Sequence, residues 1–247
     1  MLQAGNIFDI HIIQTGTRTF YSGGSPTAGQ SDNYGNINVH NPVYLENGLY
    51  DFYSVSVNSN ESPNFTFNNG YSANLNNGFD YLWSGIKGVT VTGDKTLSFN
   101  FKRLCCRIEL NVKSSPSINN MVVKKIEFAL PNAGGYTLDL ISGNIHFSSG
   151  EGVLTVIGGV GSGRIFTMLP KMGATEVAVE IDGVINGSSV SSKRFTTHLN
   201  NDFLPGVYYI IDLEIESDPA VDVKVQLLPW RLTFNENIFN LNREGIL

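Results

Sequence analysis

The stretch Val207-Tyr208-Tyr209-Ile210-Ile211-Asp212-Leu213-Glu214-Ile215 decides the fold class of this chain. Successive side chains of a β-strand point to opposite faces, so every second residue shares a face. The polar residues Asp212 and Glu214 lie on one face of this stretch. The opposite face is apolar throughout and consists of Val207, Tyr209, Ile211, Leu213 and Ile215. The alternation predicts a strand with this apolar face turned toward the core.

Similar runs of β-branched and aromatic residues recur along the whole chain, and Gly, Pro and Asn separate them about every ten residues. In 176–181, for example, Val177, Val179 and Ile181 share one face. No segment combines a helix cap with apolar residues at helical spacing. The sequence therefore predicts an all-β protein, with strands at 49–57, 95–112, 122–130, 153–157, 164–169, 176–181, 207–215 and 221–227.

The length of 247 residues suits two ordinary domains or one large β domain. The segment 113–120 is polar, rich in serine and contains Pro116, which is typical of a linker. A break there gives an N-terminal β-sandwich at 1–113 and a C-terminal β-sandwich at 114–247, each long enough for about seven strands. A single larger barrel or jelly roll is the alternative architecture.

The composition favours a secreted or surface protein. Charged residues make up 15% of the chain, against about 25% in an average soluble protein. The formal net charge is −6, and no basic cluster is longer than Lys124-Lys125, so we expect no nucleic-acid partner. No apolar run reaches the roughly 18 residues of a membrane-spanning helix.

The sequence shows no pattern of catalytic, metal-binding or cofactor-binding residues. Its four histidines are scattered singly, and no Gly-x-Ser-x-Gly nucleophile motif occurs. A β-sandwich hydrolase would need a convergent pair of carboxylates, and none is apparent. The two cysteines, Cys105 and Cys106, are adjacent, so on a strand they would point to opposite faces and would not form a disulfide with each other. We expect a non-enzymatic protein without cofactor or metal.

Tyr81 and Trp83 follow Asp80 in a cluster that combines aromatic residues with an acid. Such aromatic side chains can stack on a sugar ring, although they more often fill a core. They give a second functional hypothesis, a carbohydrate-binding surface β-sandwich protein with a weak glycan platform at Tyr81 and Trp83.

Several segments, taken in their order along the chain, resemble the fimbrillin family of surface pilins and adhesins from Bacteroides-type bacteria. An alternating strand at 7–13 runs into Thr17-Arg18, and 101–104 is similar to a family segment, with Arg103 in place of its histidine. Further similar steps lie at 138–143, 168–170, 204–209 and 227–230.

This resemblance implies two tandem transthyretin-like (Greek-key) β-sandwiches in a fimbrial subunit or tip adhesin. It also implies export to the cell surface and outer membrane as a lipoprotein. The first residues show no charged and apolar signal segment, so either the protein is cytosolic or its signal and lipid anchor precede Met1, and we expect the second. The implied partners are other fimbrial subunits and, for adhesion, a host or bacterial surface glycan or protein.

The resemblance further implies assembly by strand exchange. Proteolysis after an arginine removes the first strand, and a strand of a neighbouring subunit fills the groove. Arg18 is the candidate processing site, and an ordinary exposed arginine is the alternative. The displaced strand would carry Phe8, Ile10 and Ile12 on one face.

The C-terminal tail is the candidate donor strand, because Leu232, Phe234 and Ile238 share one face of it. Glu236 interrupts that face and would be costly to bury unless paired. The alternative is that the tail forms the last strand of its own domain or a frayed end.

Overall fold

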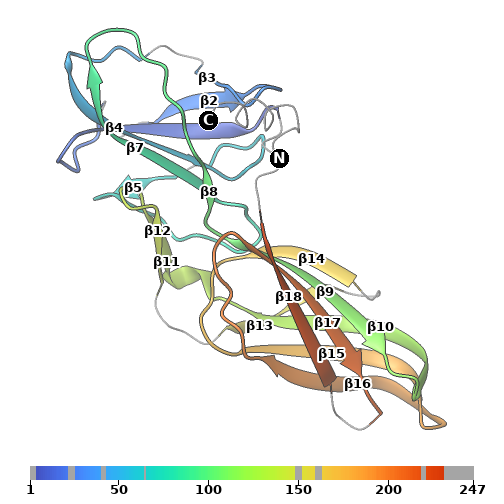
Figure 1. The fold of residues 1–247 in the computed structure, drawn as a ribbon. Coiled ribbons are helices and arrows are strands. Elements are labelled where there is room, and N and C mark those ends of the chain that lie inside the picture. Colours follow the sequence, from blue (N-terminus) through green and yellow to red (C-terminus); the bar gives the residue numbers. More distant parts are fainter. Residues whose placement is uncertain are drawn as a thin grey trace, which may run out of the picture.

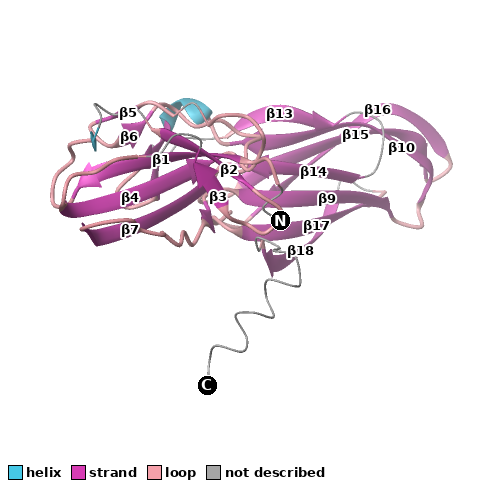
Figure 2. Ribbon diagram, turned by 90° about the horizontal axis from the view of Figure 1, so that it is seen from above, coloured by secondary structure: helices cyan, strands magenta, loops and turns pink. Residues whose placement is uncertain are grey.

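The computed structural model describes residues 4–21, 26–39, 43–63, 65–147, 152–158, 163–217 and 221–230. Their strands build two lobes that follow one another along the long axis of the molecule (Figure 1). The prediction of an all-β protein is confirmed, since the described residues contain no α-helix, and the 3-10 turn at Ala133–Gly135 is only one turn long. Figure 2 shows the strands of both lobes lying in layers.

The first lobe contains two sheets that share a core. The larger sheet has the order β3-β2-β1-β4-β7-β8 and consists of β1 (Ile7–Gln14), β2 (Thr27–Ser31), β3 (Ile37–Val39), β4 (Gly48–Ser56), β7 (Leu82–Val91) and β8 (Lys102–Arg103). The smaller sheet has the order β12-β11-β6-β5 and consists of β5 (Phe67–Asn68), β6 (Tyr71–Ser72), β11 (Tyr136–Asp139) and β12 (Asn144–Phe147).

The second lobe is a sandwich of two four-stranded sheets. One has the order β14-β9-β17-β18 and consists of β9 (Cys106–Ser114), β14 (Gly163–Met168), β17 (Val207–Ile215) and β18 (Val221–Pro229). The other has the order β13-β10-β15-β16 and consists of β10 (Ile118–Leu130), β13 (Val153–Gly158), β15 (Thr175–Ile185) and β16 (Ser188–Leu199). Strands β9 and β17 run parallel, and the other pairs in this lobe are antiparallel.

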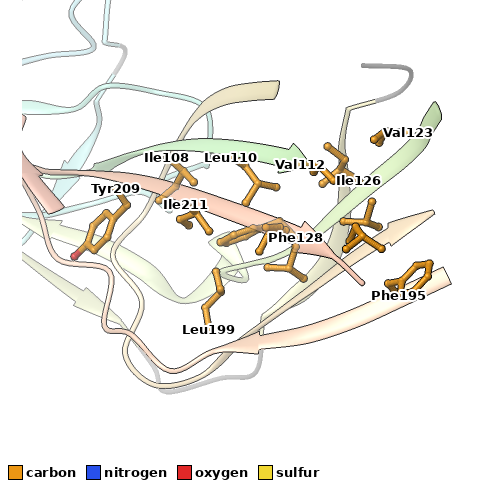
Figure 3. Close-up of a cluster of buried hydrophobic side chains, with 14 of the residues drawn as sticks. Ile108, Leu110, Val112, Val123, Ile126, Phe128, Phe195, Leu199, Tyr209 and Ile211 are labelled. Carbon is orange, nitrogen blue, oxygen red and sulfur yellow. The ribbon is translucent and has the colours of Figure 1, made fainter. Parts of the chain in front are cut away.

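The core of the second lobe lies between its two sheets (Figure 3). The alternation of β17 is confirmed, because the side chains of Tyr209, Ile211, Leu213 and Ile215 are all fully buried. The opposing sheet contributes the alternate residues of β15 and β10, among them Val177, Val179, Ile181, Ile126 and Phe128. Burial of a side chain of this kind stabilises a fold by about 1.5–3 kcal/mol, so this core is the main stabilising feature of the lobe.

The large sheet of the first lobe is buried on both faces at its central strands β1 and β4. One face packs against the small sheet through a core that includes Ile13, Tyr53 and Leu138. The other face is covered by a segment without strand structure, whose Leu97 and Phe99 pack against a second cluster. The prediction of one strand over 95–112 is therefore wrong in its first part, because these apolar residues cover a sheet face instead of joining a sheet.

The structure divides the chain between the lobes differently from the expected break after Lys113. That break falls inside β9, which pairs with β14 and β17 of the second lobe. The polar segment 113–120 forms the turn from β9 to β10, where Ser115 N donates to the carbonyl of Ile215. Serine and proline suit such a turn as well as a linker. The hairpin of β11 and β12 returns to the first lobe, where Asp139 pairs with Tyr71.

The chain first passes from the first lobe to the second at the two cysteines. Both thiols are free and fully buried, Cys105 in the first core and Cys106 in the core of the second lobe. The side chains of Cys105 and Cys106 point in opposite directions, as expected for neighbours on a strand, and each enters a different core. Burial raises the pKa of the Cys105 thiol to about 12 and raises that of Cys106 well above its usual value.

Candidate strand-exchange site

Strand β1 lies inside the large sheet of the first lobe, with a hydrogen-bonded neighbour on each side. Its first half pairs with β2, for example Phe8 with Gly29. Its second half pairs with β4 in a register that places Ile12 opposite Phe52. The strand continues past Gln14 into a turn, and the chain comes back to pair Ile13 with Phe20. Removal of β1 would leave the backbone groups of both neighbours without partners.

The side chains of β1 are buried on both faces of the sheet. On one face Phe8, Ile10 and Ile12 are buried, and Phe8 packs on Phe101 with ring centroids 5.0 Å apart. On the other face Ile13 enters the core between the two sheets. The alternation of the sequence placed Phe8, Ile10 and Ile12 on one face correctly but gave no sign that the opposite face is also covered.

Two titratable residues lie on that opposite face of β1. His11 is buried between the rings of Phe20 and Phe67, and neither of its ring nitrogens has a hydrogen-bond partner. Burial lowers the pKa of His11 to about 4 and raises the pKa of the Asp9 carboxyl to about 6, because each charged form is poorly solvated there. Burial of these groups reduces the stability of the strand in its groove.

The turn that follows β1 is exposed and contains Arg18. Gly16 has a φ of +81°, a conformation that favours glycine, and the hydroxyl of Thr17 donates to the carbonyl of Gln14 at 2.8 Å. The Arg18 side chain is 47% exposed. A protease can therefore approach this turn more easily than the strand that precedes it.

Three contacts hold the Arg18 side chain against the small sheet. Its guanidinium donates to the carbonyl of Asn69 at 3.0 Å and lies 5.4 Å from the ring centroid of Tyr71. It also lies 4.0 Å from the carboxylate of Asp139. Asp139 in turn accepts hydrogen bonds from Ile141 N and the Ser142 hydroxyl, which fixes the carboxylate in its turn. Exposed contacts of this kind contribute little individually, so Arg18 is positioned but not locked.

The proposed glycan platform is mostly inside the protein. Tyr81 is 5% exposed, and its hydroxyl accepts a hydrogen bond from Asn76 N. Trp83 is half-buried, donates from Nε1 to the carbonyl of Leu140 at 2.8 Å, and has the Lys102 ammonium over its ring at 4.7 Å. Tyr81 therefore presents no ring face to a ligand, and these aromatic residues fill the first core because the small sheet covers them.

The candidate donor residues Leu232, Phe234 and Ile238 lie outside the described residues. The last described residue, Trp230, is held where the two lobes meet. Its backbone N–H donates to the carbonyl of Gly206, and its ring lies 4.1 Å from the guanidinium carbon of Arg103. Arg103 is itself buried and forms an ion pair with Asp80. Sequence patterns pointed to Arg103 and Trp230 separately, but their contact joins residues far apart in the chain and no local signal reveals it.

A membrane-spanning helix and a metal-binding cluster of side chains are both absent from the described residues. No helix among them is long and apolar enough to cross a membrane. Within the same ranges, no group of three or more His, Cys, Asp or Glu side chains is placed to hold a metal ion.

The described residues form a two-lobed β protein whose first strand is paired on both sides within its sheet. The sequence model of the fimbrillin-like family matches residues 3–230, and the chain belongs to this family. A comparison with curated proteins gives no match.

Solved structures share the fold. A candidate cell adhesion protein from Bacteroides uniformis superimposes with a TM-score of 0.64 at 13% identity, over 93% of each chain. A second, from Bacteroides ovatus, gives a TM-score of 0.62 at 14% identity, over 94% of this chain and 89% of the other. A third, from Bacteroides fragilis, gives 0.58 at 15% identity, over 94% and 88%.

Proposed function

We propose that this chain is a non-enzymatic subunit of a surface fimbria, as a stalk subunit or a tip adhesin, and that β1 is its replaceable strand. The observation that carries the proposal is the position of β1. This strand is paired on both sides, is buried on both faces, and ends immediately before the exposed turn that contains Arg18. A cut after Arg18 would separate β1 from the rest of the chain without breaking any other strand.

The energetics favour replacement of β1 over its simple loss. Phe8, Ile10, Ile12 and Ile13 are all buried, and at about 2 kcal/mol for each such side chain the strand contributes on the order of 8 kcal/mol. Its neighbours β2 and β4 would also expose unpaired backbone groups. An incoming extended segment with apolar residues at alternate positions would restore both contributions.

The C-terminal tail of a neighbouring copy or subunit is our proposed donor. Leu232, Phe234 and Ile238 offer alternate apolar side chains, as Phe8, Ile10 and Ile12 do on β1. The tail follows Trp230, which Arg103 holds at the junction of the lobes, so its starting point is fixed.

We further propose that the protein acts at the cell surface, exported and anchored in the outer membrane by lipid, with other fimbrial subunits as partners. Membership of the fimbrillin-like family supports this placement. The description of its structural neighbours as candidate cell adhesion proteins supports a role in attachment to a surface glycan or protein. The burial of Tyr81 weighs against a glycan platform at that position.

Limited digestion with an arginine-specific protease, followed by N-terminal sequencing, tests the processing step. We expect an early cut after Arg18, with fragment 1–18 held in its groove at low protein concentration until an incoming strand replaces it. The variant Arg18→Lys serves as the control, since it keeps the positive charge and removes the cleavage site. Resistance at Arg18 while other arginines are cut would contradict a processing role.

A further inference from the structure

Strand β13 of the second lobe is an apolar strand that lies open to solvent. It occupies the edge of its sheet and pairs with β10 on one side. Val153 is 56% exposed, Leu154 37% and Val156 55%. These side chains come from both faces of the strand, so the exposed edge is apolar above and below the sheet. An exposed edge of this composition is a template for another strand.

The other edge strands carry charges that discourage pairing. Among the described strands longer than four residues, β14 has Arg164, β16 has Lys193 and Arg194, and β18 has Asp222 and Lys224. Charged residues on an edge are a common protection against unwanted association. Strand β13 has the sequence Val-Leu-Thr-Val-Ile-Gly and contains no charge. Its edge is therefore the one that lacks this protection among these four.

The charges beside β13 would not repel a second copy. The chain has a net charge of −6, so two copies repel each other unless the contact surface is locally neutral. Glu127 of β10 is the acid opposite Val156. Its carboxylate is paired with the Lys125 ammonium and with the Arg194 guanidinium. The acidic side chain of β10 next to β13 is therefore neutralised by neighbouring basic groups, and β13 itself carries no charge.

We propose that β13 is an interface between two copies of this chain, which pair through antiparallel β13 strands about a two-fold axis at Thr155. This register places Val153 of one copy opposite Ile157 of the other, and Leu154 opposite Val156. Each face of the joint sheet then receives apolar, mostly β-branched pairs, which stabilise antiparallel strands. The two sheets containing β13 would join into one continuous sheet across the dimer. The contact leaves β1 and Arg18 uninvolved, so it is independent of strand exchange.

A cysteine at the symmetry axis tests the register directly. Directly opposite residues in antiparallel strands have Cα atoms about 4.5–5.5 Å apart, which a disulfide can bridge. The uncut full-length variant Thr155→Cys should therefore form a disulfide-linked dimer under mild oxidation. The native Cys105 and Cys106 are buried and should not contribute. Thr196→Cys is the matched control, because Thr196 is exposed on β16, the opposite edge of the same sheet.

Analytical ultracentrifugation of the chain without added cysteines gives an independent measurement. We expect a monomer–dimer equilibrium whose dissociation constant rises about tenfold or more in Val156→Lys, since two apolar cross-strand pairs are lost. Val122→Lys is the matched control, because Val122 is 45% exposed on β10 away from the β13 pairing. Circular dichroism establishes that each variant is folded.

Three results would overturn the proposal. The first is a monomer at all concentrations without cross-linking of Thr155→Cys. The second is equal cross-linking of Thr155→Cys and Thr196→Cys, which would indicate random collisions. The third is a dimer that Val156→Lys does not weaken, which would place the interface elsewhere, including an interface with the C-terminal tail of another copy.

Discussion

Replacement of Asp9 by asparagine should stabilise the first lobe above pH 6 and leave its stability nearly unchanged near pH 4. Burial raises the pKa of the Asp9 carboxyl from 3.8 to about 6, so the fold disfavours the ionised form. The contribution of Asp9 to stability is therefore fully present below pH 3.8 and is lost as the pH rises through about 6. Asparagine has the shape of the protonated acid and does not titrate.

The expected magnitude follows from the size of the pKa shift. A shift of about two units corresponds to about 3 kcal/mol, which the variant should gain in free energy of unfolding at about pH 8. His11 has the opposite effect, since burial lowers its pKa from 6.5 to about 4. Its contribution is present above pH 6.5 and is lost as the pH falls through about 4. The two effects on the free energy of unfolding largely offset each other between about pH 4 and pH 8 in the wild-type chain. Asp9→Asn keeps only the loss of stability that His11 causes as the pH falls.

Urea unfolding between about pH 4 and pH 8, followed by tryptophan fluorescence, measures the difference between the two chains. Asp94→Asn is the control, because Asp94 is exposed. The difference in stability between this variant and the wild type should stay small across the pH range. A stability difference between Asp9→Asn and the wild type that is the same at every pH would refute the argument, because it would mean that Asp9 is not ionised at a cost in the folded state.

Three further predictions concern other parts of the fold. Asp139→Asn removes the carboxylate beside Arg18. Because one exposed ion pair is lost, cleavage after Arg18 should become about twofold faster. An unchanged digestion rate would show that this contact does not restrain the turn. Trp230→Ala removes a ring stacked on the buried Arg103 guanidinium and should destabilise the protein by about 2 kcal/mol in thermal unfolding. An unaltered melting temperature would show that the contact between Trp230 and Arg103 does not stabilise the fold. Cys105 and Cys106 should not react with a thiol reagent until the protein unfolds, and rapid labelling of the native chain would contradict their burial.

Local sequence patterns predicted the strands well where one face is buried and the other is exposed. The alternation in β15 and β17 identified the core residues of the second lobe, including Val177 and Tyr209. The same logic failed at 95–101, because apolar residues that cover a sheet from outside look the same in sequence as residues of a strand. Alternation also gave no sign that Asp9 and His11 are buried, because it cannot show that a second sheet covers their face of β1.

Long-range arrangement could not be predicted from local patterns. The hairpin of β11 and β12 follows a strand of the second lobe yet pairs with β6 in the first, which places Asp139 beside Arg18. The resemblance singled out Arg18, but the contacts that position its side chain come from residues about 50 and 120 positions away, and only tertiary structure supplies them. The stack of Arg103 on Trp230 has the same origin.

The most direct test of the central claim compares the oligomeric state of the chain before and after a cut at Arg18. Sedimentation velocity is measured over a range of concentrations. The cut chain should form concentration-dependent oligomers that are larger than any species of the uncut chain, and fragment 1–18 should be released. Deletion of 232–247 should abolish these oligomers and leave the monomer folded. Cut full-length protein that forms no larger species at any concentration and keeps fragment 1–18 bound would contradict the account. A deletion that unfolds the second lobe would show that the tail belongs to its own domain.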